Sequence, residues 1–243
     1  MGKQKIKIIE LGNLRKPLNR KWLGKHKSNL FEITEYSQRE FLPRPSGNYG
    51  TLDVVYSKNE ITILLKDEKY DGIIVGIMNY GYDDNFYMHR IGDNSMVVSI
   101  YGLRKILADE EICVENFILK NIYEAVAFYN IFGGLTNDGV YGMVHQDTRG
   151  CLFDLNGDRQ DVIYNTEKAI VCEECKGRLK SSSLPDGFVH LLERGLTQID
   201  KPLIKRVEVF IRRYPLVSFL GAILGATAIN TASNFIYDWI RGK

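Results

Sequence analysis

The sequence lacks the short motifs by which many enzymes bind nucleotides or activate a serine nucleophile. Its 243 residues contain no Walker phosphate loop, no nucleophile elbow and no dinucleotide fingerprint. The stretches GDNS and NGDR are ordinary turn sequences. The apolar and charged fractions, 44% and 26%, are those of a globular protein. These absences argue against phosphate-loop and dinucleotide-binding enzymes and leave metal chemistry and binding to consider.

A strong net charge is also missing. The formal charge is +2 at pH 7, so no global field favours nucleic acid as a partner. The charge is nevertheless uneven, because residues 1–28 contain one acid, Glu10, against many lysines and arginines. Such a stretch faces solvent, anionic lipid or RNA. Aromatic residues do not alternate with the cations as they do in proteins that stack single-stranded bases, so nucleic acid is an unlikely partner.

Cysteine is scarce, and three of the four cysteines lie close together in the sequence. Cys172 and Cys175 form a Cys-x-x-Cys pair, and His145 and Cys151 supply two more donors upstream, which is the spacing of a tetrahedral zinc site. We expect no secretory leader, and thiols in a reducing compartment bind metal more often than they form disulfides. A redox pair and plain buried thiols are the alternatives. Cys113 stands apart, and we expect it to be a small buried hydrophobe.

The segment 214–237 contains no charged residue and is long enough to cross a bilayer as a helix. Aromatic residues mark its ends, and Gly221 and Gly225 form a small-residue ladder that lets helices pack closely. We therefore expect a transmembrane helix at 214–240, membrane lipid as a partner, and a homo-oligomer. The body would lie on the cytoplasmic face of a membrane with a C-terminal tail anchor. A buried core helix or a soluble oligomer seam is the alternative.

Hydrophobic periodicity indicates the remaining elements. We expect strands at 5–12, 31–36, 72–79 and 96–103, an edge hairpin between the last two, and helices at 15–30, 59–66 and 114–131. The run 72–79 is apolar throughout, which predicts the centre of a sheet that is buried on both faces.

A polar spacer at 181–187 is the one plausible domain boundary in the sequence. It would separate a mixed domain at 1–180 from an amphipathic helical connector at 186–213. The transmembrane helix at 214–240 would follow the connector directly.

In this order the elements resemble an archaemetzincin, a compact zinc peptidase of the metzincin class. The resemblance covers residues 5–180 and rests on GIIVGIMN, on VVSIYGLRKIL, on the helix that carries YEAV, and on the segment from His145 to Cys175. It implies an α+β fold with a metzincin-like mixed β-sheet, packed helices and a zinc knuckle. An all-helical C-terminal tail with the transmembrane helix would follow. Gln146 stands where the family has a cysteine, so His145 or Asp147 would complete the structural zinc site, and His145 is the better ligand.

The same resemblance implies that the catalytic ligands have been lost. The family's two helical histidines and its glutamate fall on Ala127, Phe128 and Ile131, and none of these binds zinc or moves a proton. No histidine occurs between His89 and His145, so no other register restores the site. We expect no catalytic residues and no peptidase activity of the family type.

The resulting hypothesis is a non-catalytic, zinc-stabilised binding domain tethered to a membrane. It would act as a self-associating sensor or effector subunit with a peptide or protein ligand in the former substrate cleft. One alternative is a membrane-anchored zinc-dependent hydrolase or peptidase with an atypical site. Its ligands would come from the side chains His89, His145, Asp83, Asp84, Asp147 and Asp154. Another alternative is a membrane-disrupting, pore-forming effector.

Overall fold

The computed structural model describes residues 2–46, 54–199, 207, 211 and 214–240. The chain divides into two compact units, Met1–Asp200 and Lys201–Lys243. In the described part of the second unit, the main element is a single long helix, α9 (Pro215–Ile240). The two units are treated separately below.

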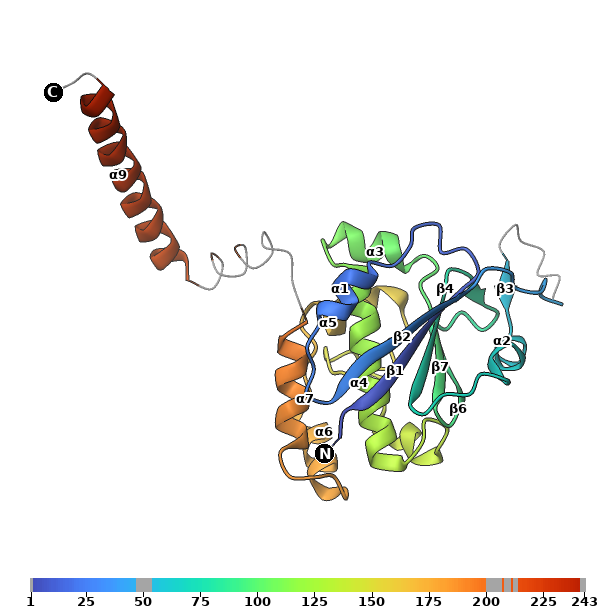
Figure 1. The fold of residues 1–243 in the computed structure, drawn as a ribbon. Coiled ribbons are helices and arrows are strands. Elements are labelled where there is room, and N and C mark those ends of the chain that lie inside the picture. Colours follow the sequence, from blue (N-terminus) through green and yellow to red (C-terminus); the bar gives the residue numbers. More distant parts are fainter. Residues whose placement is uncertain (1, 47–53, 200–206, 208–210, 212–213, 241–243) are drawn as a thin grey trace. The chain divides into compact units, whose positions relative to one another are not determined.

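A five-stranded sheet in the order β2-β1-β4-β7-β6 organises the first unit (Figure 1). Its strands are β1 (Gln4–Leu11), β2 (Phe31–Arg39), β4 (Ile73–Met78), β6 (Met88–Gly92) and β7 (Ser95–Ser99). The pairs β1–β2, β1–β4 and β4–β7 are parallel, and β6 runs antiparallel to β7 at the edge. Two short strands, β3 (Val55–Tyr56) and β5 (Gly81–Tyr82), pair separately. Every residue of β4 is buried, which confirms the predicted sheet centre.

Helices cover both faces of this sheet. They are α1 (Arg20–Lys25), α2 (Lys58–Leu65), α3 (Leu103–Asp109), α4 (Val114–Phe132), α5 (Val162–Glu167), α6 (Glu173–Ser181) and α7 (Phe188–Thr197), with short 3-10 turns η1 (Asp138–Met143) and η2 (Arg159–Asp161). Successive strand residues point to opposite faces, so Ile6 and Ile8 of β1 join the large core around α4. Ile9 and Leu11 join a smaller core with α2 on the other face.

Three local predictions need correction. The expected helix 15–30 is much shorter, because Asn19 caps it by accepting a hydrogen bond from the backbone N–H of Trp22. The helix expected from Asn59 begins one residue earlier, after a capping box between Ser57 and Glu60. Cys113 is exposed at the N-cap of α4 rather than buried.

The boundary expected at 181–187 also differs from the structure, in which the first unit continues to Asp200. Helix α7 packs against α4, and its residues Phe188 and Leu192 are buried in the main core. An amphipathic helix is stable only when its apolar face is covered, and α4 provides that cover. The later part of the connector predicted at 186–213 lies largely outside the described residues.

Candidate metal centre

Four side chains converge on one point at the end of the first unit's core. His145, Cys151, Cys172 and Cys175 place one donor atom each within 4.8 Å of the others. His145 and Cys151 come from irregular chain after η1, where they form isolated bridges with Asp154 and Ile170. Cys172 is the N-cap of α6, and Cys175 lies in its first turn. The structure therefore brings together all four residues that the sequence predicted.

The distances and donor types fit a tetrahedral zinc ion. His145 Nε2 lies 3.0 Å from Cys175 Sγ and 3.2 Å from Cys172 Sγ. Zinc bonds to sulfur and nitrogen predict donor separations of about 3.5 to 3.8 Å, so an ion fits between the four atoms after a small outward movement. Among the described residues, this is the one group of three or more His, Cys, Asp or Glu side chains arranged for a metal.

Asp154 holds the loop that presents Cys151. Its Oδ2 accepts backbone N–H hydrogen bonds from Arg149 and Cys151, both at 2.8 Å. The carboxyl group is buried, and that burial raises its pKa, while the two N–H groups act in the opposite direction. Asp154 is a candidate ligand only in the alternative hydrolase hypothesis, and its contacts in the structure give it a positioning role. The carboxylate fixes the turn from which Cys151 reaches the ion.

The surroundings of the thiols favour their ionisation when a metal cation binds. The pKa of Cys151 is lowered to about 5, chiefly by a hydrogen bond from the Cys175 side chain and also by the backbone N–H of Cys172. The pKa of Cys175 is raised for the complementary reason, since the two sulfur atoms share a proton. A bound divalent cation replaces that proton and stabilises both thiolates. The N-terminus of α6, which carries Cys172, adds favourable positive potential.

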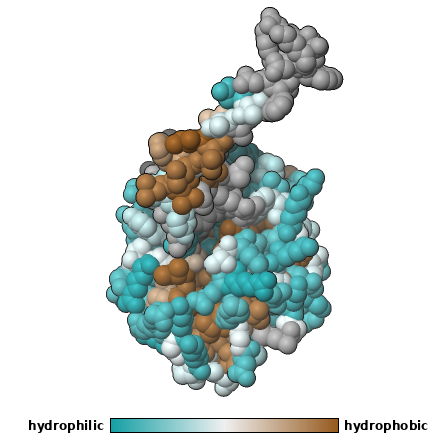
Figure 2. Space-filling model, turned by 90° about the vertical axis from the view of Figure 1, so that its left-hand side faces the viewer, coloured by the Kyte–Doolittle hydropathy of each residue, from teal (hydrophilic) through white to brown (hydrophobic). Residues whose placement is uncertain are grey.

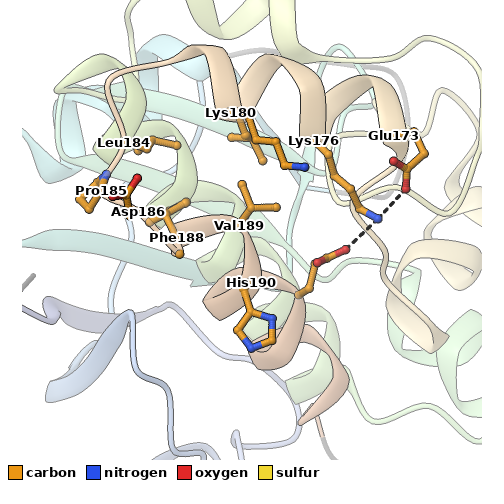
Figure 3. A pocket seen from close by; sticks show the side chains of 12 residues that line it. Glu173, Lys176, Lys180, Leu184, Pro185, Asp186, Phe188, Val189 and His190 are labelled. Atoms are coloured by element: carbon orange, nitrogen blue, oxygen red, sulfur yellow. Dashed lines mark hydrogen bonds and ion pairs between the residues drawn. The ribbon is translucent and has the colours of Figure 1, made fainter.

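Helix α6 links the metal centre to α7 through a groove of about 470 Å³ (Figure 3). Lys176 Nζ lies 2.7 Å from Glu173 and 2.9 Å from Glu193, so it joins the two helices across the groove. Figure 3 shows Lys180 and His190 beside the same groove. The side chain that follows Cys175 thus connects the metal ligands to the last helix of the unit.

A second polar cluster, which local sequence patterns hardly indicate, lies in the middle of α4. Glu124 is buried and accepts from Arg90 Nη2 at 2.7 Å and from Lys120 Nζ at 3.2 Å. The Arg90 guanidinium, from the edge strand β6, also lies over the ring of Phe128, 4.6 Å from its centroid. The pair Lys120 and Glu124 has the spacing of a helical ion pair, which was the available sequence signal. The involvement of Arg90 required the tertiary structure.

The structure separates the other candidate ligands from the metal centre. His89 Nε2 lies 2.8 Å from Asp84 Oδ2, beyond β5. Asp147 pairs with Arg149 at 2.6 Å, and Arg149 also reaches Glu174. These contacts form small ion pairs rather than one ligand group among the described residues.

Comparison with known proteins gives one informative match. No family model matches the sequence, and no curated protein matches it. Among solved structures, the chain is similar to a crystal structure of archaemetzincin from Methanopyrus kandleri, with a TM-score of 0.50 and 16% identity. The alignment covers 73% of this chain and 94% of that chain. The chain has an archaemetzincin-like fold.

The archaemetzincin-like fold confirms the resemblance found in the sequence and its mixed sheet with packed helices. In this setting the donor set of one imidazole and three thiols identifies the expected cofactor as zinc. The four candidate ligands come from irregular chain and from the N-terminus of α6, so a bound zinc would stabilise the contact between these segments.

Proposed function

We propose that the first unit is a non-catalytic, zinc-stabilised binding domain and that α9 carries it on a membrane. The zinc, when bound, would fix the loops after η1 against α6. The former substrate cleft of the archaemetzincin-like fold would then hold a peptide or protein ligand without cleaving it. The chain would act as a sensor or effector subunit of a membrane-bound assembly.

The observation that carries this proposal is the packing of Arg90 against α4. The resemblance puts the catalytic positions at Ala127, Phe128 and Ile131, and the first two are fully buried. The guanidinium of Arg90 lies over Phe128 and is held there by Glu124. A fixed cation beside an aromatic ring opposes the approach of a divalent metal ion through charge repulsion and desolvation. This arrangement supports a binding role rather than hydrolysis.

The edge strand β6 offers a suitable surface for a peptide. It pairs with β7 on one side and ends the five-strand order. An extended segment can add to such an edge through main-chain hydrogen bonds, while side chains supply specificity. Met88 and His89 of this strand are partly exposed, so they are available to contact a ligand, whereas Arg90 is held against α4.

Helix α9 supports the proposed membrane anchorage. The stretch Pro215–Ser233 is 19 residues long and has a mean hydropathy of 1.5, and none of its described residues is buried. Figure 2 shows hydrophobic side chains on the described part of α9. Gly221 and Gly225 are exposed on it and would allow close packing of two copies, which supports a homo-oligomer. The reduced cysteine cluster favours a cytoplasmic face for the domain.

A metal count on the full chain, purified in lipid nanodiscs, tests the catalytic half of the proposal. We expect one zinc per chain, loss of that zinc in Cys175→Ser, and no cleavage of unfolded casein. A second zinc per chain, or cleavage that disappears in His89→Ala while folding is retained, would establish the hydrolase alternative.

Membrane anchorage has its own test in cells. The full chain should resist carbonate extraction, and a chain lacking residues 214–243 should be released while it retains zinc. Gly221→Ile with Gly225→Ile should weaken cross-linking between copies. Extraction of the full chain by carbonate would overturn anchorage. Leakage of dye from vesicles carrying the purified chain would favour the pore-forming alternative.

A further inference from the structure

The segment between β1 and β2 is the most uniformly charged part of the described surface. From Leu11 to Phe31 the sequence contains no acidic residue. Its cations are all exposed: Arg15, Lys16, Arg20, Lys21, Lys25 and Lys27. A charge run of this kind is normally balanced by acids on neighbouring elements when its role is only to keep the surface soluble.

The fold fixes the direction in which this segment faces. Leu23 of α1 is fully buried and anchors the helix to the main core, and α1 contacts α4. Lys21 and Lys25 lie one helical turn apart and are exposed. The backbone carbonyl of Lys16 accepts a hydrogen bond from Arg104 of α3, which holds the preceding loop in place. The cations are therefore displayed on a folded surface.

Carboxylates beside this surface compensate only part of the charge. Glu10 is buried and pairs with Arg20 Nε at 2.7 Å. Glu115 accepts the backbone N–H of Asn19. Glu40 lines a neighbouring cleft together with Arg15. Apart from the pair with Glu10, the described residues provide no ion pair for the six cations, so the surface remains positive.

An exposed aromatic residue lies next to these cations. Phe41 is 88% exposed, the most exposed large hydrophobic side chain in the described part of the first unit. It lines a cleft of about 690 Å³ with Arg15 and Arg20, which places it beside the basic segment. Cations surrounding an exposed aromatic side chain are the composition of a surface that binds the lipid interface.

We propose that residues 15–27 and Phe41 form a lipid-docking face that binds the headgroups of anionic phospholipids. The cations would lie among the lipid phosphates, and the Phe41 ring would enter the interface. Lipid is favoured over RNA because one exposed aromatic ring offers no series of stacking platforms for bases. The choice of lipid rests in part on the proposed membrane anchorage, since an inserted α9 would tether the first unit to a bilayer.

The docking should depend on the number of cations. Each lysine or arginine near an anionic membrane strengthens binding about fivefold, so removal of three should weaken docking about a hundredfold. Added salt should weaken it further, because the attraction between exposed charges is screened. Replacement of Phe41 by serine should reduce docking without altering the dependence on salt.

Energy transfer from Trp22 to dansyl-labelled lipid headgroups measures this docking directly. The chain has two tryptophans, Trp22 on α1 and Trp239, so the full chain with Trp239→Phe reports on the proposed face alone. Vesicles would contain phosphatidylcholine alone or phosphatidylcholine with one third phosphatidylserine. We expect greater transfer with the anionic vesicles and loss of that difference in Lys16→Gln/Lys21→Gln/Lys25→Gln.

A matched control removes the same charge from the opposite side of the sheet. Lys58, Lys66 and Lys69 are exposed on and just after α2, which belongs to the other core. Replacing these three with glutamine should leave the energy transfer unchanged. Equal transfer with both kinds of vesicle, or an equal loss in the control, would overturn the proposal. So would RNA binding that the first triple variant abolishes while transfer to lipid is unchanged.

The test distinguishes docking from anchorage. Insertion of α9 is measured by resistance to carbonate, whereas docking is measured by the difference between neutral and anionic vesicles. A chain that fails to insert but still prefers anionic vesicles through residues 15–27 would retain the docking face and lose the proposed anchor. The opposite pattern would retain the anchor and remove the docking face.

Discussion

The metal centre and the middle of α4 belong to the same hydrophobic core, but they achieve electrostatic balance differently. At the metal centre, Cys151 and Cys175 share a proton and His145 Nε2 contacts Cys175 Sγ, so a bound ion would be needed to stabilise both thiolates. In α4, Glu124 already has two cationic partners within the protein. The comparison shows two ways of balancing buried polar groups in one core. The loops of the metal centre would need a bound ion, whereas in α4 protein side chains supply the opposite charges.

Removal of the structural zinc should have the largest effect. Cys175→Ser should release the ion and unfold the region from η1 to α6, because zinc binding supplies several kcal/mol of folding free energy to sites of this type. Thermal unfolding of the full chain in nanodiscs should show a much lower and broader transition. Zinc content measured on the same sample would link the two effects.

Cys113→Ser provides the matched control, since this thiol is exposed and outside the cluster. It should retain zinc and unfold at the original temperature. If Cys175→Ser lost the ion with no change in the transition, the metal centre would resemble α4 in being self-sufficient. The proposed difference between the metal centre and the middle of α4 would then be wrong.

The next largest effect should come from Glu124. Glu124→Leu leaves Lys120, whose side chain is 0% exposed, without its carboxylate, and breaking a buried ion pair in this way costs about 3–5 kcal/mol. Urea unfolding of the single variant should show this loss. Glu124→Leu combined with Lys120→Met should recover part of it, since the buried charge of Lys120 is removed together with its partner while Arg90 still lacks its carboxylate.

That pair of variants also separates a structural role from a metal site. Zinc content should stay at one per chain in both, because neither residue is a metal ligand. If the double variant were no more stable than Glu124→Leu alone, the loss of stability would not come from leaving Lys120 without a carboxylate.

The sequence predicted those parts of the fold that depend on local patterns. The uniformly apolar β4, the long helix α4 and the clustering of the four candidate metal ligands were predicted, because hydrophobic periodicity and cysteine spacing are visible in short stretches of sequence. The length of α1 was wrong because the cap at Asn19 outweighed a longer amphipathic pattern. Arg90 could not be placed, since it meets Glu124 only after β6 is folded against α4.

Acidification should affect the metal centre before it affects α4. The folded-state pKa of Cys151 is lowered to about 5 from 9.0, so between these two pH values its thiolate adds stability that increases with pH, whereas the raised pKa of Cys175 reverses the trend above pH 9.0. That contribution declines as the pH falls and is lost below about 5. Zinc retention after dialysis at decreasing pH should fall in this range. Retention that stayed constant well below pH 5 would show that the ion, once bound, does not compete with protons at Cys151.

The smallest expected effect comes from Lys176, which tests whether the metal centre stabilises α7 through α6. Lys176→Met removes the ion pair with Glu173 within α6 and the ion pair with Glu193 of α7, and partly exposed ion pairs of this kind contribute about 0.5–1 kcal/mol. Hydrogen exchange should speed up in α7 and remain unchanged in α4. Lys180→Met, on the same helix and beside the same groove, should leave exchange in α7 as it was. If both variants loosen α7 equally, the groove's apolar packing rather than Lys176 couples it to α6. If neither variant changes hydrogen exchange in α7, a bound zinc would stabilise the chain only as far as α6, and packing against α4 would account for the stability of α7.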